Sequence, residues 1–181
     1  LLYGFLINLT PEFFAGEWLQ FFCYLFVSGG FLFMFGSFVP SWDSQYYNLM
    51  MCQNIPYINY IKSKWLLVVL ATIISTILGC IIYSFIGFNA FCAVLAGGLY
   101  NIGVNGYLTL WAGAYTKTPI DLNSSKNAFG DTKALNMKTM LISIPQMILP
   151  LVLFGICNNY FGWLFGCTAV AFIGILGIFL K

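Results

Sequence analysis

Residues 65–111 read WLLVVLATIISTILGCIIYSFIGFNAFCAVLAGGLYNIGVNGYLTLW. This stretch contains no Asp, Glu, Lys or Arg, and its clearest break is the turn-like Gly87-Phe88-Asn89. A helix that crosses a bilayer needs about 20 apolar residues, so the stretch predicts two spans, Trp65 to about Ile86 and Ala90 to Trp111. Because the connection is so short, the two helices must pair as an antiparallel hairpin.

Further apolar runs flank this hairpin on both sides. Lipid offers backbone groups no partner outside a helix or a closed barrel, and the runs lack the alternation of barrel strands. We therefore predict an all-α fold, a polytopic transmembrane helix bundle of about six spans, as a single domain over residues 1–181. The five complete spans are predicted at Trp18–Val39, Trp65–Ile86, Ala90–Trp111, Met140–Ile156 and Phe161–Leu180. We expect a tight turn at Asn158-Asn159-Tyr160 between the last two.

The first apolar run, Leu1–Leu9, is shorter than the length a membrane span requires. It also lacks the basic start and the cleavage site of a signal peptide. We interpret it as the truncated tail of a first span that begins upstream, in a chain of which residues 1–181 are the carboxyl-terminal part.

The composition excludes several classes of function. Of the 181 residues, 61% are hydrophobic and 7% are charged, whereas a soluble domain carries about 25% charged residues, so lipid is the expected main partner. The net charge is +2 and the chain has no Arg, which argues against nucleic-acid binding. The chain also has no His, so we expect no zinc or haem site and treat the six cysteines as small apolar side chains.

The seven lysines predict the orientation of the bundle. All of them fall in the connections 40–64 and 112–138 or at the carboxyl end, and none falls in 10–17, 87–89 or 157–160. Lysine-rich connections stay in the cytoplasm, so both ends of the chain are predicted to be cytoplasmic.

The connection 41–61 has the pattern of a cytoplasmic amphipathic helix. Ser41 is a suitable helix cap, Asn54-Ile55-Pro56 ends the helix, and Pro56 suits the start of a second helix that runs into the next span. Apolar and aromatic residues recur at spacings of three and four, which gives one apolar face. That face either caps the bundle at the membrane surface or binds a cleft of a cytoplasmic motor subunit as a coupling helix. The candidate partner-binding residues are Trp42, Asp43, Tyr46, Tyr47, Leu49 and Met50.

The span from 90 to 111 is unusually polar between Gly97 and Tyr107. Asn101 and Asn105 are four residues apart and share a helix face, and four glycines between 97 and 106 allow close helix packing. One interpretation is a packed interface in which the Asn side chains bond across helices. The other is a polar lining of a substrate path, or a locally unwound helix beside a cavity. The candidate residues are Asn101, Asn105, Tyr107 and Gln146, the last of which lies between Pro145 and Pro150.

Two tracts carry a resemblance to a known family. The segment 41–51, followed by Ile55-Pro56 and 60–64, resembles the connection between the second and third spans of ABC-2-type transporter permeases. The tracts Trp42–Tyr47 and Tyr100–Asn105, with Lys117 and 120–123 downstream, resemble more closely an uncharacterised bacterial permease-like family with Trp-Asp-Ser-x-Tyr-Tyr and Tyr-Asn-Ile-Gly-Val-Asn tracts. The resemblance implies a permease subunit in the bacterial cytoplasmic (inner) membrane that works with a separate nucleotide-binding ATPase. The chain departs from the typical permease in having only residues 158–160 where a sizeable outer loop precedes the last span.

The motifs that are missing from the sequence limit its chemistry. No span contains an ionisable Asp, Glu, Lys or His, which argues against proton-coupled transport. No Walker A sequence is present, so we expect this chain not to be an enzyme and to hold no cofactor of its own, with ATP and Mg²⁺ in the partner. The alternative is a non-catalytic integral subunit that anchors or assembles a larger membrane complex. Either role suits a homo- or hetero-oligomer.

Overall fold

The computed structural model describes residues 16–36, 49, 52, 56–116 and 137–179, and these are helical apart from short turns. Helices α2 (Glu17–Phe35), α5 (Tyr57–Ser84), α8 (Met137–Phe161) and α9 (Trp163–Phe179) are α-helices. Between α5 and α8, one continuous helix consists of α6 (Phe88–Tyr100), the π-helical segment η2 (Asn101–Asn105) and α7 (Gly106–Thr116). The all-α prediction is confirmed for this part of the chain, which contains no strand.

Three of the helices are long and apolar enough to cross a membrane, namely Ile58–Ser84, Phe88–Gly113 and Ile144–Phe161. This is compatible with an integral membrane protein. Apolar segments of α2 and α9 are shorter. The number of spans and the side on which the two ends lie stay predictions, and the run Leu1–Leu9 falls outside the described residues.

Helix boundaries agree with the sequence at α5 and differ at α8. Helix α5 begins directly after Pro56 and runs without a break into the apolar span, as predicted. The predicted turn at 158–160 is wrong, because α8 continues through these residues to Phe161. The chain reverses instead at Gly162, whose φ of 87° lies in the left-handed region that glycine favours. The last helix therefore begins at Trp163 rather than at Phe161.

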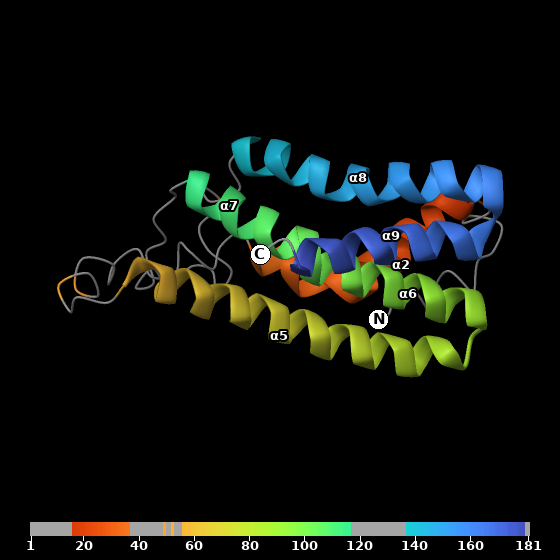
Figure 1. The fold of residues 1–181 in the computed structure, drawn as a ribbon, viewed down its shortest axis with the longest axis horizontal. Coiled ribbons are helices and arrows are strands. Elements are labelled where there is room, and N and C mark those ends of the chain that lie inside the picture. Colours follow the sequence, from red (N-terminus) through yellow and green to blue (C-terminus); the bar gives the residue numbers. More distant parts are fainter. Residues whose placement is uncertain (1–15, 37–48, 50–51, 53–55, 117–136, 180–181) are drawn as a thin grey trace.

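The helices lie roughly side by side along the long axis of the molecule (Figure 1). Helices α5 and α8 form its two edges, and α2, α6 and α9 lie between them. The start of α5, the end of α7 and the start of α8 gather at one end, which we call the lysine end because it carries Lys62 and Lys64. The α5–α6 turn and the connection between α8 and α9 lie at the opposite end, which we call the turn end.

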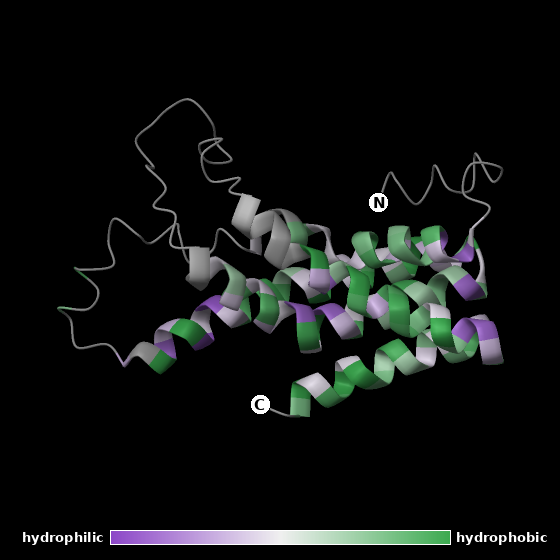
Figure 2. Ribbon diagram, turned by 90° about the horizontal axis from the view of Figure 1, so that it is seen from above, coloured by the Kyte–Doolittle hydropathy of each residue, from purple (hydrophilic) through white to green (hydrophobic). Residues whose placement is uncertain are grey.

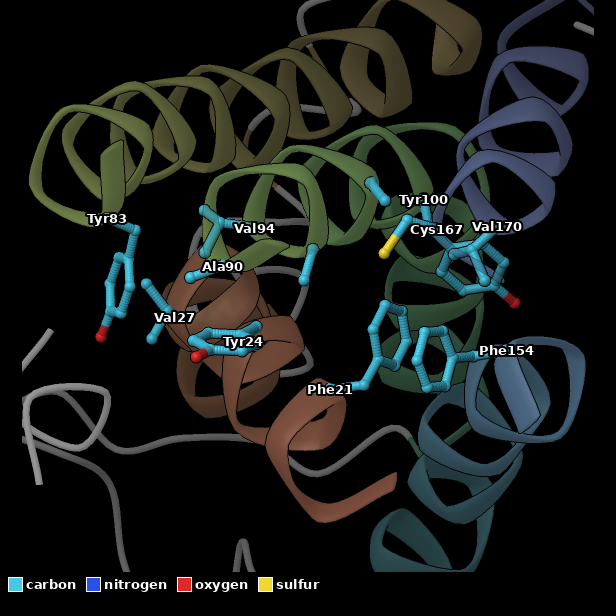
Figure 3. Close-up of a cluster of buried hydrophobic side chains, with 12 residues drawn as sticks. Phe21, Tyr24, Val27, Tyr83, Ala90, Val94, Tyr100, Phe154, Cys167 and Val170 are labelled. Carbon is cyan, nitrogen blue, oxygen red and sulfur yellow. The ribbon is translucent and has the colours of Figure 1, made fainter. Parts of the chain in front are cut away.

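The main apolar core lies toward the turn end (Figure 3). Phe21 of α2 stacks on Phe154 of α8 with ring centroids 4.0 Å apart, and Tyr24 meets Tyr83 of α5 edge to face at 5.5 Å. Outside the core, large apolar side chains of α5 such as Ile74 and Ile81 are exposed. Hydrophobic residues dominate the helices and hydrophilic ones are few (Figure 2), as expected of helices that face lipid.

Glycines bring the middle helices unusually close together. A Cβ added to Gly174 of α9 would lie 2.6 Å from the backbone of Leu99 and Tyr100, and one added to Gly177 would lie 2.7 Å from Gly103 O. A Cβ on Gly97 would lie 3.2 Å from Leu25 Cα of α2. The predicted close packing around the polar tract is therefore present, with α9 on one side and α2 on the other.

Candidate functional site

The predicted coupling residues lie almost wholly outside the described residues. Of the six, only Leu49 is described; it is helical and 64% exposed. Exposure of an apolar side chain at this position suits a surface that binds a partner or a membrane. The roles of Trp42, Asp43, Tyr46, Tyr47 and Met50 stay predictions.

The second candidate set belongs to a group of buried polar side chains in the middle of the bundle. We call this group the polar seam. Asn101, Asn105 and Thr109 follow one another at intervals of four along η2 and α7, so they lie in a row on one face of the helix. The other members come from the neighbouring helices α2 and α8. The members, all buried, are Ser28, Asn101, Asn105, Thr109 and Gln146. Thr72 of α5 is also buried, but its hydroxyl donates to Val68 O within its own helix.

Asn101 ties the seam to α2. Its Nδ2 donates to Leu25 O at 3.2 Å and to Ser28 Oγ at 3.0 Å. Ser28 in turn donates its own proton to Leu25 O at 3.0 Å. Gly29 leaves the space that the amide needs, since a Cβ there would lie 2.9 Å from Asn101 Cγ. A residue that is 0% exposed thus has its donor atom satisfied within the protein.

Asn105 and Thr109 extend the seam from Asn101 toward α8. Asn105 Nδ2 donates to Asn101 Oδ1 at 2.7 Å, and Thr109 Oγ1 donates to Asn105 O at 2.7 Å. Thr109 Oγ1 also lies 3.4 Å from Gln146 Oε1 on α8. The hydroxyl has one proton and the shorter contact takes it, so the contact with Gln146 is weak.

Two amides of the seam keep buried atoms without a hydrogen-bond partner among the described residues. They are Asn105 Oδ1 and Gln146 Nε2, on side chains that are 0% and 2% exposed. Pro150 adds to this, because it has no N–H to donate to the carbonyl of Gln146 four residues earlier. A buried polar atom without a partner is uncommon in a native protein and calls for a ligand, a water or a functional reason.

The irregular segment η2 sets the direction in which these amides point. In a π-helix the backbone bond spans five residues, and here Gly106 N donates to Asn101 O. Such a turn shifts every following side chain around the helix axis relative to a regular α-helix. Segments of this kind occur frequently at functional sites.

Among the described residues, Tyr107 forms no hydrogen bond with a member of the polar seam. It stacks on Trp65 of α5, with ring centroids 5.4 Å apart and planes 22° apart. Its hydroxyl oxygen is buried and has no hydrogen-bond partner among the described residues. The structure therefore brings together three of the four predicted residues, Asn101, Asn105 and Gln146. Tyr107 instead lies against Trp65 of the neighbouring helix α5.

Ser28 and Thr109 are the members of the seam that the sequence analysis did not select. Thr109 continues the four-residue spacing of Asn101 and Asn105, and that spacing is the signal that would have found it. Ser28 is a single hydroxyl residue in an apolar run, and nothing in the sequence marks it as a neighbour of Asn101.

The seam consists of neutral amides and hydroxyls, which bind water and uncharged polar groups and whose oxygens can also coordinate a hard cation. The described residues contain no group of three or more His, Cys, Asp or Glu that could hold a metal ion.

Comparison with known proteins places the whole chain in one family. Residues 1–181 match the family described as a family of unknown function, DUF5687. The chain belongs to the DUF5687 family. No curated protein and no solved structure matches it. The DUF5687 match includes both the described helices and the predicted coupling segment, so both are features of one family domain.

Proposed function

We propose that this DUF5687 chain is the membrane-spanning permease subunit of an ABC-2-like transporter that works with a separate cytoplasmic ATPase in the bacterial inner membrane. One observation carries the proposal. The tract Tyr100–Asn105, which carries part of the resemblance to an uncharacterised permease-like family, contains the π-helical segment and supplies the two Asn amides of the seam. An irregular helix beside buried polar groups at mid-depth is an arrangement that transporters use for substrate sites.

Movement of the ATPase would reach the seam through α5. The first predicted helix of the segment 41–61 ends at Asn54-Ile55-Pro56, and α5 starts at Tyr57, so a displacement of that helix acts directly on the start of α5. Helix α5 packs against α2, and Ser75 Oγ of α5 donates to Val27 O of α2 at 2.9 Å. Because Asn101 bonds to the adjacent Ser28, a tilt of α5 would change the packing around the seam.

Copurification tests this proposal directly. The tagged protein is extracted gently from its own membranes, and the proteins that accompany it are identified by mass spectrometry. We expect a nucleotide-binding ATPase to copurify. Its repeated absence from such preparations would contradict the proposal.

A charge substitution tests the docking face of the segment 41–61. Tyr46→Asp combined with Leu49→Asp places two charges on the predicted apolar face and should abolish recovery of the ATPase. The matched control, Gln45→Asp with Asn48→Asp, adds the same charge to the other faces of the same predicted helix and should leave recovery unchanged. Equal effects of the two pairs would exclude a docking face.

The alternative role is a non-catalytic subunit that anchors or assembles a membrane complex. The close crossing of α9 over η2 favours it, because helices packed backbone to backbone make a rigid scaffold. This role predicts that other membrane chains copurify in fixed ratio and that no ATPase is recovered.

A further inference from the structure

The polar seam occupies only one half of the bundle. Asn101 lies near the middle of the continuous helix 88–116, and Asn105 and Thr109 follow toward the lysine end. Gln146 lies in the half of α8 that starts from the same end. In the other half, the residues that α6 buries are apolar or glycine apart from Tyr100.

The turn end is closed by apolar packing and by hydrogen bonds between residues at the helix ends. Figure 3 shows the core around Phe21, Phe154 and Tyr83, which belongs to that half of the molecule. Trp163 Nε1 donates to Asn89 O at 3.0 Å, and Asn158 donates to the carboxylate of Glu17. Among the described residues, the apolar cluster at the lysine end is much smaller and is built on Leu32 and Val68.

The unpartnered atoms of the seam point to the chemistry of its ligand. Asn105 Oδ1 is an acceptor, and Gln146 offers one amide atom whichever way its amide is turned. The apolar runs 18–42, 65–111 and 140–180 contain no Asp, Glu, Lys or Arg. A charged ligand in the seam would therefore lack a counter-charge and would lose its hydration without compensation.

We propose that the polar seam is a binding site at mid-depth for an uncharged solute that bears a hydroxyl or amide group, and that the site opens only toward the lysine end. Asn105 and Gln146 bind the solute, while Asn101 and Thr109 hold Asn105 in place through their hydrogen bonds. This inference rests on the proposed function and gives it a substrate class and a side of entry, which is the cytoplasmic side if the lysine end is cytoplasmic.

Thiol reactivity in native membranes tests the site without any ATPase. Thr109→Cys places a thiol in the seam, and Val94→Cys places one in the closed half, where Val94 is fully buried. The chain's own cysteines serve as references, since Cys52 is exposed and Cys167 is 3% exposed within the core. Iodoacetamide is the uncharged probe, iodoacetate is its charged counterpart, and mass spectrometry measures the modification of each residue.

We expect iodoacetamide to modify Thr109→Cys at least tenfold faster than Val94→Cys or Cys167. Relative to Cys52, iodoacetate should modify Thr109→Cys at least tenfold more slowly than iodoacetamide does. A Thr109→Cys thiol as unreactive as Cys167 would overturn the site, and equal reactivity of Val94→Cys would overturn the one-sided opening. Protection of the Thr109→Cys thiol by sodium ions would assign a cation and overturn the uncharged ligand.

Two features keep the outcome decisive. A misfolded variant would expose Cys167 as well, so an unreactive Cys167 shows that the fold is intact. Gln146→Cys is a second variant that places the thiol on α8 and repeats the same measurement. Because the assay needs no ATPase, an unreactive seam leaves the copurification result standing, and an absent ATPase leaves the reactivity result standing.

Discussion

At the scale of single residues, the seam holds amides in two different states. Asn101 donates to two oxygens of α2 and accepts from Asn105, so its groups are used within the protein. Gln146 has one long contact and a buried nitrogen without a partner among the described residues. A protein under selection for stability alone would not keep the second arrangement, because an apolar residue would pack there at no polar cost.

This contrast predicts opposite effects on stability. Gln146→Met keeps the length of the side chain and removes the unpartnered amide, so the free energy of unfolding should stay constant or rise by about 1 kcal/mol. Asn101→Leu keeps the branched shape but removes the donor to Ser28 Oγ and leaves Asn105 Nδ2 without its acceptor, so it should lower the free energy of unfolding by about 1–3 kcal/mol. Denaturant unfolding in detergent measures both variants. A loss in Gln146→Met as large as that in Asn101→Leu would show that Gln146 has a purely structural role.

The residue scale also shows what sequence reasoning could reach. Asn101, Asn105 and Gln146 stood out because amides are rare in apolar helices, and the structure brings them together. Tyr107 was selected with them, but it lies against Trp65. Ser28 could not be found, because its contact with Asn101 joins positions 73 residues apart and depends on how α2 packs.

At the scale of helices, the apolar runs predicted where helices exist better than where they end. The pair Asn158-Asn159 reads as a turn, but α8 continues through it because Gly162 supplies the left-handed residue that ends a helix. The π-helical turn at Asn101–Asn105 was also beyond the sequence, since periodicity places residues on a regular helix. The Gly-rich tract did indicate close helix packing, which the structure shows. The other interpretation, a locally unwound helix, is not what the structure has, because the helix continues through the tract with a π-helical turn.

The crossing of α9 over η2 gives a prediction at this scale. In Gly174→Ala the new Cβ would lie 2.6 Å from the backbone of Leu99, which cannot move aside as a flexible side chain would, so the helices must separate. We expect a loss of about 1–3 kcal/mol in the free energy of unfolding, as for other overpacked cores. The measurement is denaturant unfolding of the purified protein in detergent.

Gly30→Ala is the matched control for this crossing. Gly30 lies within helix α2, and nothing lies within 4 Å of a Cβ added to it. Alanine has the higher helix propensity, so this variant should be as stable as the parent or more stable by up to about 1 kcal/mol. If both variants lost the same stability, backbone flexibility and not the close crossing would explain the glycines.

At the scale of the whole molecule, the two ends of the bundle differ in character. The turn end has tight connections, an apolar core and hydrogen bonds between helix ends, while the polar seam lies in the half of the bundle toward the lysine end, where the long connections begin. The orientation in the membrane stays a prediction from the lysines, because cationic connections stay on the cytoplasmic side. The uncharged interior between these ends is what makes the proposed solute uncharged.

The orientation makes a prediction about Lys62 and Lys126. Helix α7 ends and α8 begins at the same end of the molecule as the start of α5, so the connection that contains Lys126 leaves from and returns to the end that carries Lys62 (Figure 1). The two lysines should therefore lie on one side of the membrane. A membrane-impermeant amine reagent should label neither residue in intact cells and both after permeabilisation, as read by mass spectrometry. Labelling of only one of them in intact cells would place them on opposite sides, and neither the coupling role of 41–61 nor entry of a solute from the cytoplasm could then hold.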